Sequence, residues 1–257
     1  MFADIHSHLL DKAFDETRND IIKRFSKDGV AFAVENATCL KDCFEASELA
    51  SENENIFCAV GIHPEFADSF DCDTEKELES LILSNDKIVA VGEIGLDYHY
   101  DDSPSREIQI KCFERQIALA ERIGLPIVVH SRDASDDTMN VLKNSGANAV
   151  LHCYSGSTET ALKYMDMGYY ISFGGVLTFK KTKKQVAVLK SIPSDRILTE
   201  TDCPYMAPEP VRGTVNEPSN IRYIIEKMAE LMSLSYEETE KLTLDNALRF
   251  YGIDRKL

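Results

Sequence analysis

Short apolar runs alternate along the chain with longer stretches in which apolar residues recur every three or four positions. The first pattern is typical of strands buried on both faces, and the second of helices with one buried side. Strands are predicted at residues 2–5, 30–34, 56–61, 88–92, 127–129, 149–151, 169–173 and 197–201. Eight strands that alternate with helices predict a (β/α)8 TIM barrel. The length of 257 residues fits one such barrel, so we expect a single domain over residues 1–257.

Two of the helical stretches have clear boundaries. In residues 106–122, Ile108, Cys112 and Leu119 fall close to one helical face, and Ser105 before the stretch predicts an N-cap. A second helix is predicted at residues 235–250, opened by Ser-Tyr-Glu-Glu. It follows the eighth strand, so we expect this additional C-terminal helix to pack across the barrel. Residues 207–218 carry three of the eight prolines and predict a fixed loop after the eighth strand.

Metal-binding residue types stand at the ends of most predicted strands. Imidazole and carboxylate groups are the main protein ligands of divalent metals. In a parallel barrel the carboxyl ends of the strands converge on one face, so ligands far apart in the sequence become neighbours. These residues are His6, His8, His63, Glu93, His130, His152 and Asp202. The sequence therefore predicts a metal site for one or two divalent ions, which could be Mg, Mn or Zn.

Glu93 is the expected centre of this site. It closes the apolar strand in Val-Gly-Glu-Ile-Gly-Leu-Asp, where an unpaired carboxylate would be unfavourable to bury. His6 and His8 are two residues apart, which places both imidazoles on the same side of an extended segment. A glutamate can bridge two ions, so Glu93 fits between an ion held by His6 and His8 and another held by His130 and His152.

Asp202 ends the eighth strand, beside the first one, where its carboxylate can bind metal and accept the proton of a bound water. His63, in Gly-Ile-His-Pro, is expected to orient substrate or a water. Cys153 and Cys203 each follow an expected ligand, but adjacent strand residues point to opposite faces, so we interpret them as packing residues. The alternative for each histidine taken alone is an ordinary imidazole in the core or on the surface. Their shared position at strand ends favours a functional site.

Composition and charge exclude several classes of protein. The mean hydropathy is −0.24 and no apolar run approaches the roughly 20 residues that span a bilayer, so no membrane association is expected. The first predicted strand starts at Phe2, which leaves no room for a signal peptide and predicts a cytoplasmic location. The seven cysteines form no Cys-x-x-Cys pair and predict reduced thiols. The net charge of −16 argues against a long basic groove for double-stranded DNA.

At this point a family resemblance is evident over nearly the whole length. The motifs that carry it are DIHSHL, VGIHPE, VGEIGLDYHYDDSPSREIQIKC, IVVHSRDA, HCYSG, SFGGVLTFK, ETDCPYMAP and RGTVNEP. The chain resembles the TatD family of metal-dependent deoxyribonucleases, within the metal-dependent hydrolase barrels. The resemblance implies hydrolysis of phosphodiester bonds in DNA. It also implies the metal ligands, which are His6, His8, Glu93, His130, His152 and Asp202.

The chain departs from the family in one loop. Family members often carry basic residues between Arg-Gly and Asn after the eighth strand, whereas Thr214 and Val215 stand there in this sequence. The expected cationic contacts to phosphate are Arg132, Lys180 and Arg212. The alternative for each of them is a solvated surface charge. Tyr154 is expected either to stack on a base or to be a core tyrosine.

The sequence supports one favoured function and two alternatives. The favoured one is a divalent-metal-dependent hydrolase, with Asp202 and Glu93 as catalytic residues, that removes nucleotides from 3′ ends of short or single-stranded DNA. The first alternative keeps the metals and assigns them a small ester, lactone or amide. The second is a non-catalytic barrel that binds metal or a partner. A purely structural metal site would be closed by four ligands, and this argues against the last one. The sequence identifies no protein partner.

Overall fold

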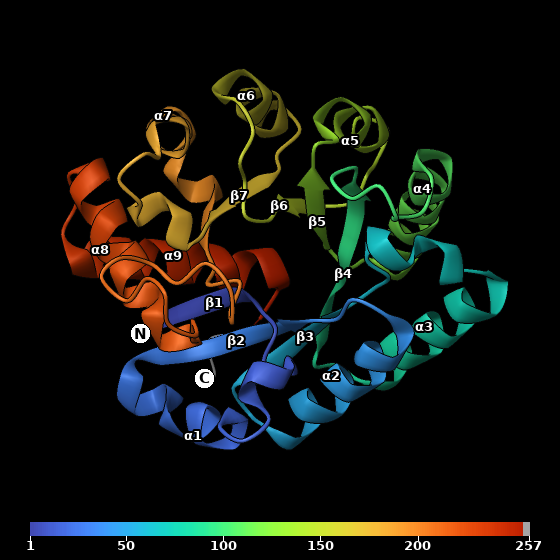
Figure 1. Ribbon diagram of the computed structural model, residues 1–257, viewed down its shortest axis with the longest axis horizontal. Helices are drawn as coiled ribbons and strands as arrows, with labels where there is room; N and C mark the ends of the chain where they lie inside the picture. Colours follow the sequence, from blue (N-terminus) through green and yellow to red (C-terminus); the bar gives the residue numbers. More distant parts are fainter. Residues whose placement is uncertain (254–257) are drawn as a thin grey trace. The chain divides into compact units, whose positions relative to one another are not determined.

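The computed structural model of the chain describes residues 1–253, so the last four residues of the predicted domain lie outside the described part. Each of the eight predicted strands is present, and together they form one parallel sheet in the order β1 to β8. Helices alternate with the strands along the chain (Figure 1). The prediction of a (β/α)8 fold with an additional C-terminal helix is therefore confirmed.

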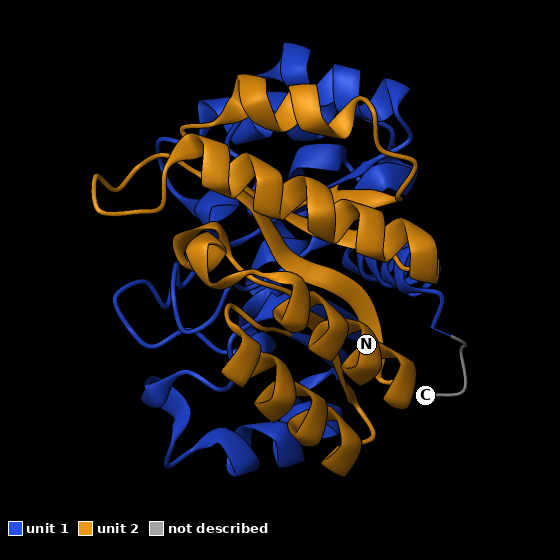
Figure 2. Ribbon diagram, turned by 90° about the vertical axis from the view of Figure 1, so that its right-hand side faces the viewer, with its two compact units in different colours: residues 1–35, 153–257 blue, residues 36–152 orange. Residues whose placement is uncertain are grey.

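The chain divides into two compact units (Figure 2), one made of residues 1–35 with the chain from Cys153 onward, the other of residues 36–152. The prediction of a single domain over residues 1–257 stays a prediction. The strands and α-helices of the first unit are β1 (Phe2–Ser7), α1 (Arg18–Asp28), β2 (Val30–Asn36), α6 (Thr158–Asp166), β7 (Tyr170–Phe173), α7 (Lys183–Ser191), β8 (Ile197–Thr199), α8 (Ile221–Met232) and α9 (Tyr236–Tyr251). Strand β2 extends one residue beyond this unit. Four short 3-10 helices, η1 (Lys12–Phe14), η3 (Gly175–Thr178), η4 (Ser194–Arg196) and η5 (Pro218–Asn220), also belong to it.

The second unit alternates four strands with four helices among its described residues. Its elements are α2 (Leu40–Glu52), β3 (Ile56–Val60), the 3-10 helix η2 (Pro64–Ser69), α3 (Cys72–Ser84), β4 (Ile88–Asp97), α4 (Arg106–Ile123), β5 (Ile127–Arg132), α5 (Ser135–Leu142) and β6 (Ala149–Leu151). Helix α4 packs on β4 and α2 packs on β3. The predicted cap of α4 is confirmed, because the Ser105 hydroxyl accepts a hydrogen bond from the Ile108 N–H at 3.4 Å. Strands β3, β4 and β6 are almost wholly buried, as continuous apolar runs predict.

Helix α9 is the predicted C-terminal helix, and it packs against β1 and β8. The Tyr251 hydroxyl donates to the carbonyl of Ile5 at 3.0 Å, and the Asn246 side chain donates to the carbonyl of Ile197 at 2.8 Å. Both acceptors lie in strands, so the last helix is tied by buried hydrogen bonds to the first and last strands.

Several strands end at positions other than those that the apolar pattern predicted. Strand β4 continues beyond Glu93 to Asp97, because its pairing with β5 extends to Asp97 opposite Arg132. Glu93 therefore lies inside its strand and does not close it. Strand β8 ends at Thr199, and Asp202 follows it with a positive φ of 55°.

None of the helices in the described part has the combination of length and hydropathy needed to cross a bilayer. A cytoplasmic location stays a prediction.

Helix α9 begins with a capping box, in which Ser235 accepts from the Glu238 N–H at 3.1 Å and Glu238 accepts from the Ser235 N–H at 2.8 Å. Replacing Ser235 with alanine leaves the Glu238 N–H without its acceptor, so we expect Ser235→Ala to lower the free energy of unfolding by about 1 kcal/mol in urea titrations. The control is Ser84→Ala at the end of α3, where the hydroxyl bonds a carbonyl of the same helix. An equal decrease in both variants would contradict the capping role.

Gly95 brings β4 against β5 in a conformation reserved for glycine. Its φ is +144°, and a Cβ at this position would collide with the carbonyl group of His130. We expect Gly95→Ala to lower the free energy of unfolding by about 2 kcal/mol or more, because strain and collision add. The control is Gly146→Ala, whose Cβ would meet only a carboxylate oxygen of Glu121 at 3.7 Å. Unchanged stability of Gly95→Ala would show that the two strands can separate here at no cost.

Candidate metal centre

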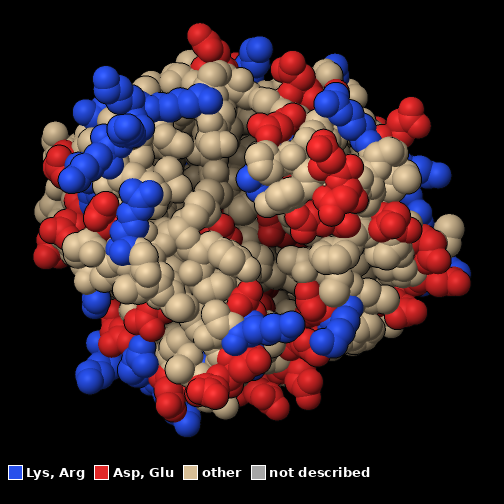
Figure 3. All heavy atoms as spheres, in the orientation of Figure 1, with Lys and Arg blue, Asp and Glu red and all other residues tan. Residues whose placement is uncertain are grey.

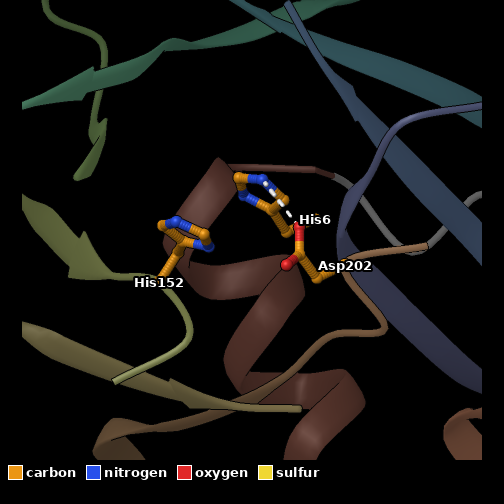
Figure 4. A group of neighbouring side chains, drawn as sticks. All are labelled: His6, His152 and Asp202. Atoms are coloured by element: carbon orange, nitrogen blue, oxygen red, sulfur yellow. Dashed lines mark ion pairs between the residues drawn. The ribbon is translucent and has the colours of Figure 1, made fainter. Parts of the chain in front are cut away.

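The first unit brings together three of the predicted ligands. His6 and His8 extend from β1, and Asp202 follows β8. The two imidazole Nε2 atoms lie 3.2 Å apart, and Asp202 Oδ1 lies 3.7 Å from His6 Nε2 and 3.4 Å from His8 Nε2. Figure 4 shows His6 and Asp202 with their ion pair dashed, and it also draws His152 of the second unit. The three donor atoms of the first unit therefore converge on one point.

Backbone hydrogen bonds hold these three residues in place. The Asp202 N–H donates to the carbonyl of His6, and the His8 N–H donates to the carbonyl of Cys203, both at 2.9 Å. The segment after β8 therefore runs beside the end of β1, although the strand itself stops at Thr199. The left-handed conformation of Asp202 is part of this turn. Its carboxylate is thus positioned by the chain on both sides of it.

A buried carboxylate holds the turn that follows His8. The two oxygens of Glu35, at the end of β2, accept the N–H groups of Leu9 at 2.6 Å and Leu10 at 3.0 Å. Arg18 donates to the carbonyl of Leu9 at 2.6 Å. Burial raises the pKa of Glu35 to about 7, against the opposing effects of His8 and of these hydrogen bonds. Sequence analysis missed Glu35, and only its position as the first charge after an apolar strand could have indicated it.

Asp4 supports the same region from within β1. It is fully buried, and its carboxylate accepts from the Thr201 N–H at 2.8 Å and from the Thr201 hydroxyl at 2.5 Å. Burial raises the pKa of Asp4 to about 8, although these hydrogen bonds oppose the rise. Asp4 thereby links β1 to the segment that leads to Asp202. It was also missed, because an acidic residue inside an apolar strand gave no indication of its partner.

The second unit brings together the other three predicted ligands. Glu93 lies in β4, His130 in β5, and His152 directly after β6. Glu93 Oε1 lies 2.8 Å from His130 Nδ1 and 2.8 Å from His152 Nε2, and these two nitrogens are 3.1 Å apart. The sequence thus identified a second convergent group of three donor atoms.

Asp97 is a further carboxylate of this group that sequence analysis missed. Its Oδ2 lies 3.0 Å from Nε2 of His130, the ring nitrogen on the side away from Glu93. Burial alone would lower the pKa of His130, but its hydrogen bonds to Asp97 and Glu93 outweigh burial and raise the pKa to about 9. Glu93 and Asp97 are four residues apart in one strand, so they share a face. This even-numbered spacing was the feature of the sequence that could have indicated Asp97.

His63 lies beside this group and has a different character. Its Nε2 is 3.7 Å from Glu93 Oε1, and its Nδ1 accepts a hydrogen bond from the Glu65 N–H at 3.3 Å. Burial lowers the pKa of His63 to about 3, so the ring is neutral. A neutral ring with an accepting Nδ1 carries its proton on Nε2, on the side of Glu93. This geometry suits the predicted orienting role better than ligation.

The two groups fit divalent ions by their chemistry. Ligands at about 2.1 Å from a tetrahedral ion are about 3.4 Å from one another. The donor atoms are 3.2 to 3.7 Å apart in the first group and 2.8 to 3.1 Å apart in the second. Asp97 stands behind His130 as carboxylates commonly do behind a metal-binding histidine. Within the described residues, the candidate metal groups contain no cysteine.

The predicted substrate contacts lie in varied surroundings. Arg132 is exposed, and its guanidinium lies 3.1 Å from the hydroxyl of Tyr100. Tyr154 is buried, and its hydroxyl donates to the carbonyl of Ser157 at 2.8 Å, which is the arrangement of a core tyrosine. Lys180 is exposed. Arg212 is exposed and lies over the ring of Phe179 at 4.1 Å.

Comparison with known proteins gives relatives that match the chain from end to end. It is 42% identical to the uncharacterized metal-dependent hydrolase YabD of Bacillus subtilis, over 99% of this chain and 100% of that protein. It is 34% identical to the uncharacterized metal-dependent hydrolase YcfH of Escherichia coli, over 98% and 96%. The crystal structure of YJJV, a TatD homologue from Escherichia coli, superimposes with a TM-score of 0.92 at 28% identity, covering 98% of each chain.

A second solved structure, a TatD-family hydrolase from Entamoeba histolytica, has a TM-score of 0.88 at 25% identity and covers 97% of each chain. The family model described as TatD related DNase matches residues 3–252. This match spans both candidate metal groups and agrees with the motifs noted in the sequence. The chain therefore belongs to the TatD family of metal-dependent hydrolases.

Proposed function

We propose that each of the two donor groups binds a divalent ion and that the protein hydrolyses phosphodiester bonds at the 3′ ends of single-stranded DNA. The observation that carries the proposal is the presence of two convergent groups of three donor atoms, one in each unit. Two such groups suit a pair of ions, and paired ions are common in enzymes that cleave phosphate esters. The family description as a related DNase supports this choice of bond.

The ligand set follows from the geometry of each group. His6, His8 and Asp202 would hold one ion, and Glu93, His130 and His152 the other. When bound, divalent ions supply a lowered pKa for water and electrostatic stabilisation of the charge that develops on the phosphoryl oxygens. The choice among Mg, Mn and Zn is part of the test below.

The remaining chemistry belongs to side chains of the protein. Asp202 keeps 14% of its side chain exposed, so water and substrate can reach it, and we assign it to accept the proton of the attacking water. His63 carries its proton on the side of Glu93 and would orient a water or a phosphate oxygen by donating a hydrogen bond. Arg132 and Arg212 would contact the substrate phosphate.

A second candidate substrate is a small ester, lactone or amide. The net charge of −16 favours it, because a strongly acidic protein repels a polyanion at long range. The same ions and the same Asp202 would serve that reaction. The two substrates are distinguished by which compound is turned over.

Removal of either acidic residue tests the centre. We expect Glu93→Gln and Asp202→Asn each to reduce nucleotide release on the order of 10³-fold or more, because each removes a charged oxygen from the centre. The assay uses a 3′-labelled single-stranded oligonucleotide and chelator-stripped protein, with magnesium, manganese or zinc restored separately. Asp195→Asn is the control, since this exposed carboxylate lies in η4 and is expected to retain full activity.

Each result of that assay has a definite meaning. The proposal is supported if the parent protein and the control release nucleotides in a metal-dependent way and the two variants do not. The ion that restores release is then the working ion. Full activity in Glu93→Gln or Asp202→Asn overturns the assignment of that residue. If no ion restores nucleotide release while a panel of esters, lactones and amides is hydrolysed, the second candidate replaces the first.

Asp97 is expected to act through His130. Its carboxylate fixes the tautomer and the orientation of that ring, and removal of such a partner typically reduces metal affinity about 10- to 100-fold. We therefore expect Asp97→Asn to shift the metal concentration for half-maximal activity upward by such a factor, with activity recovered at saturating metal. The control is Asp133→Asn, which lies 2.9 Å from His99 in an exposed pair. Equal shifts in both variants would contradict a specific role for Asp97.

A further inference from the structure

One stretch of this acidic chain carries positive charge alone. The chain has 44 acidic residues, yet residues 167–194 contain neither aspartate nor glutamate and include five lysines. Four of them stand within five positions, and we refer to Lys180, Lys181, Lys183 and Lys184 as the lysine cluster. In a chain with a net charge of −16, the charge of this segment therefore has the opposite sign.

The lysine cluster lies after the carboxyl end of β7. It occupies the loop between η3 and α7 and the first turn of α7, where all four lysines are exposed. Basic atoms gather over α7 in the upper left of Figure 3, which has the orientation of Figure 1. His6, His8 and Asp202 lie at the corresponding ends of β1 and β8 in the same unit.

These lysines differ from five other lysines of the chain. Lys23, Lys41, Lys76, Lys227 and Lys241 each pair with an acidic residue one turn away on the same helix. Within the described residues, no member of the lysine cluster makes an ion pair. Their charge is therefore not neutralised by the protein itself.

The position of Lys183 and Lys184 in the first turn of α7 is also unfavourable for the stability of that helix. The positive end of a helix dipole disfavours cations, and a charge there typically contributes about 0.3–1 kcal/mol. Helices α1 to α6 and α9 carry an acidic residue in the first turn, whereas α7 begins with Lys183 and Lys184. The lysines and the helix end both attract anions, so the arrangement favours binding at some expense of stability.

An aromatic residue and an arginine border the lysine cluster. Phe179 precedes it, and the guanidinium of Arg212 lies 4.1 Å from the centre of the Phe179 ring. The loop after β8 is fixed against this segment, because the Glu209 N–H donates to the Thr178 hydroxyl at 2.9 Å. The carboxylate of Glu209 itself lies 4.0 Å from Arg212. Flat groups beside exposed cations suit a strand with both bases and phosphates.

We propose that the lysine cluster, with Phe179 and Arg212, is a docking surface for single-stranded DNA, which holds the phosphates of nucleotides that lie outside the metal centre. This inference rests on the proposed function, since the docked strand is the substrate. The surface lets a protein of net charge −16 select polynucleotides over short diesters. The short extent of the cluster suits a single strand rather than a duplex.

The test compares two variants with equal changes of charge. One carries Lys181→Gln, Lys183→Gln and Lys184→Gln, and leaves Lys180 in place because it is an expected contact to the substrate phosphate. The control carries Lys23→Gln, Lys27→Gln and Lys76→Gln, all exposed helix residues of α1 and α3. Binding of a phosphorothioate single strand of about 20 nucleotides to the metal-loaded protein is measured by fluorescence anisotropy at several salt concentrations. Hydrolysis of a thymidine dinucleotide is measured in parallel.

We expect the cluster variant to bind the strand at least about 10-fold more weakly than the parent protein. We also expect its plot of log affinity against log salt to be shallower by about 2, because each phosphate neutralised on a single strand contributes about 0.7 to the slope. Dinucleotide hydrolysis should be unchanged in both variants, and the control should bind the strand nearly as the parent does. A thermal melt of the cluster variant no lower than that of the parent would show that the fold is intact.

Other outcomes separate the two proposals. Equal weakening in both variants, or weakening in neither, overturns the docking surface. If the parent hydrolyses the dinucleotide but does not bind the strand, the docking surface is overturned while the diesterase reaction holds. If the cluster variant alone fails to bind the strand but no diester is hydrolysed by any protein, the docking surface is upheld and the hydrolytic proposal is overturned.

Discussion

A carboxylate that leaves water must find cations or hydrogen-bond donors in the protein, because its hydration is too favourable to be given up without replacement. Much of the arrangement around the candidate centre follows from this constraint. Glu93 is almost fully buried, and two imidazoles stand within 2.8 Å of one of its oxygens. Asp97 faces the opposite nitrogen of His130 at 3.0 Å. The same geometry that solvates these acids in the protein also places nitrogen and oxygen donors where divalent ions would bind.

Other buried acids satisfy the constraint with backbone groups and thereby position the donors. Glu35 accepts two N–H groups from the turn after His8. Glu200 accepts the N–H of Cys153, the residue that follows His152, at 2.5 Å and the Ser172 hydroxyl at 2.6 Å. A carboxylate holds a backbone segment more rigidly than an apolar contact does, since each hydrogen bond has a direction. Removal of one such acid would leave buried N–H groups without an acceptor, so these residues belong to the construction of the centre.

The distribution of charge is a second feature of the structure that bears on binding. The protein is strongly acidic as a whole, and most α-helices carry an acidic residue in the first turn, which stabilises them through the helix dipole. The segment from β7 through α7 lacks acids altogether. Its lysines therefore stand at the start of a helix, where most of the other helices carry acids. The acidic surface as a whole would repel a polyanion, whereas these lysines would attract it. They lie on the side of the strand ends where His6, His8 and Asp202 are found.

The sequence by itself determined the eight strands, their alternation with helices, the cap at Ser105 and six expected ligands, since apolar periodicity and residue chemistry are local properties. Tertiary structure decided the extent of β4, because pairing with β5 carries it on to Asp97. It also placed Asp202 in a turn beyond β8, where a hydrogen bond to the carbonyl of His6 holds it. Asp4 and Glu35 could not be recognised in advance, because the role of a buried acid depends on partners distant in the sequence. Residue types and their spacing predict which atoms can bind a metal, whereas only the packed chain decides which carboxylates support them.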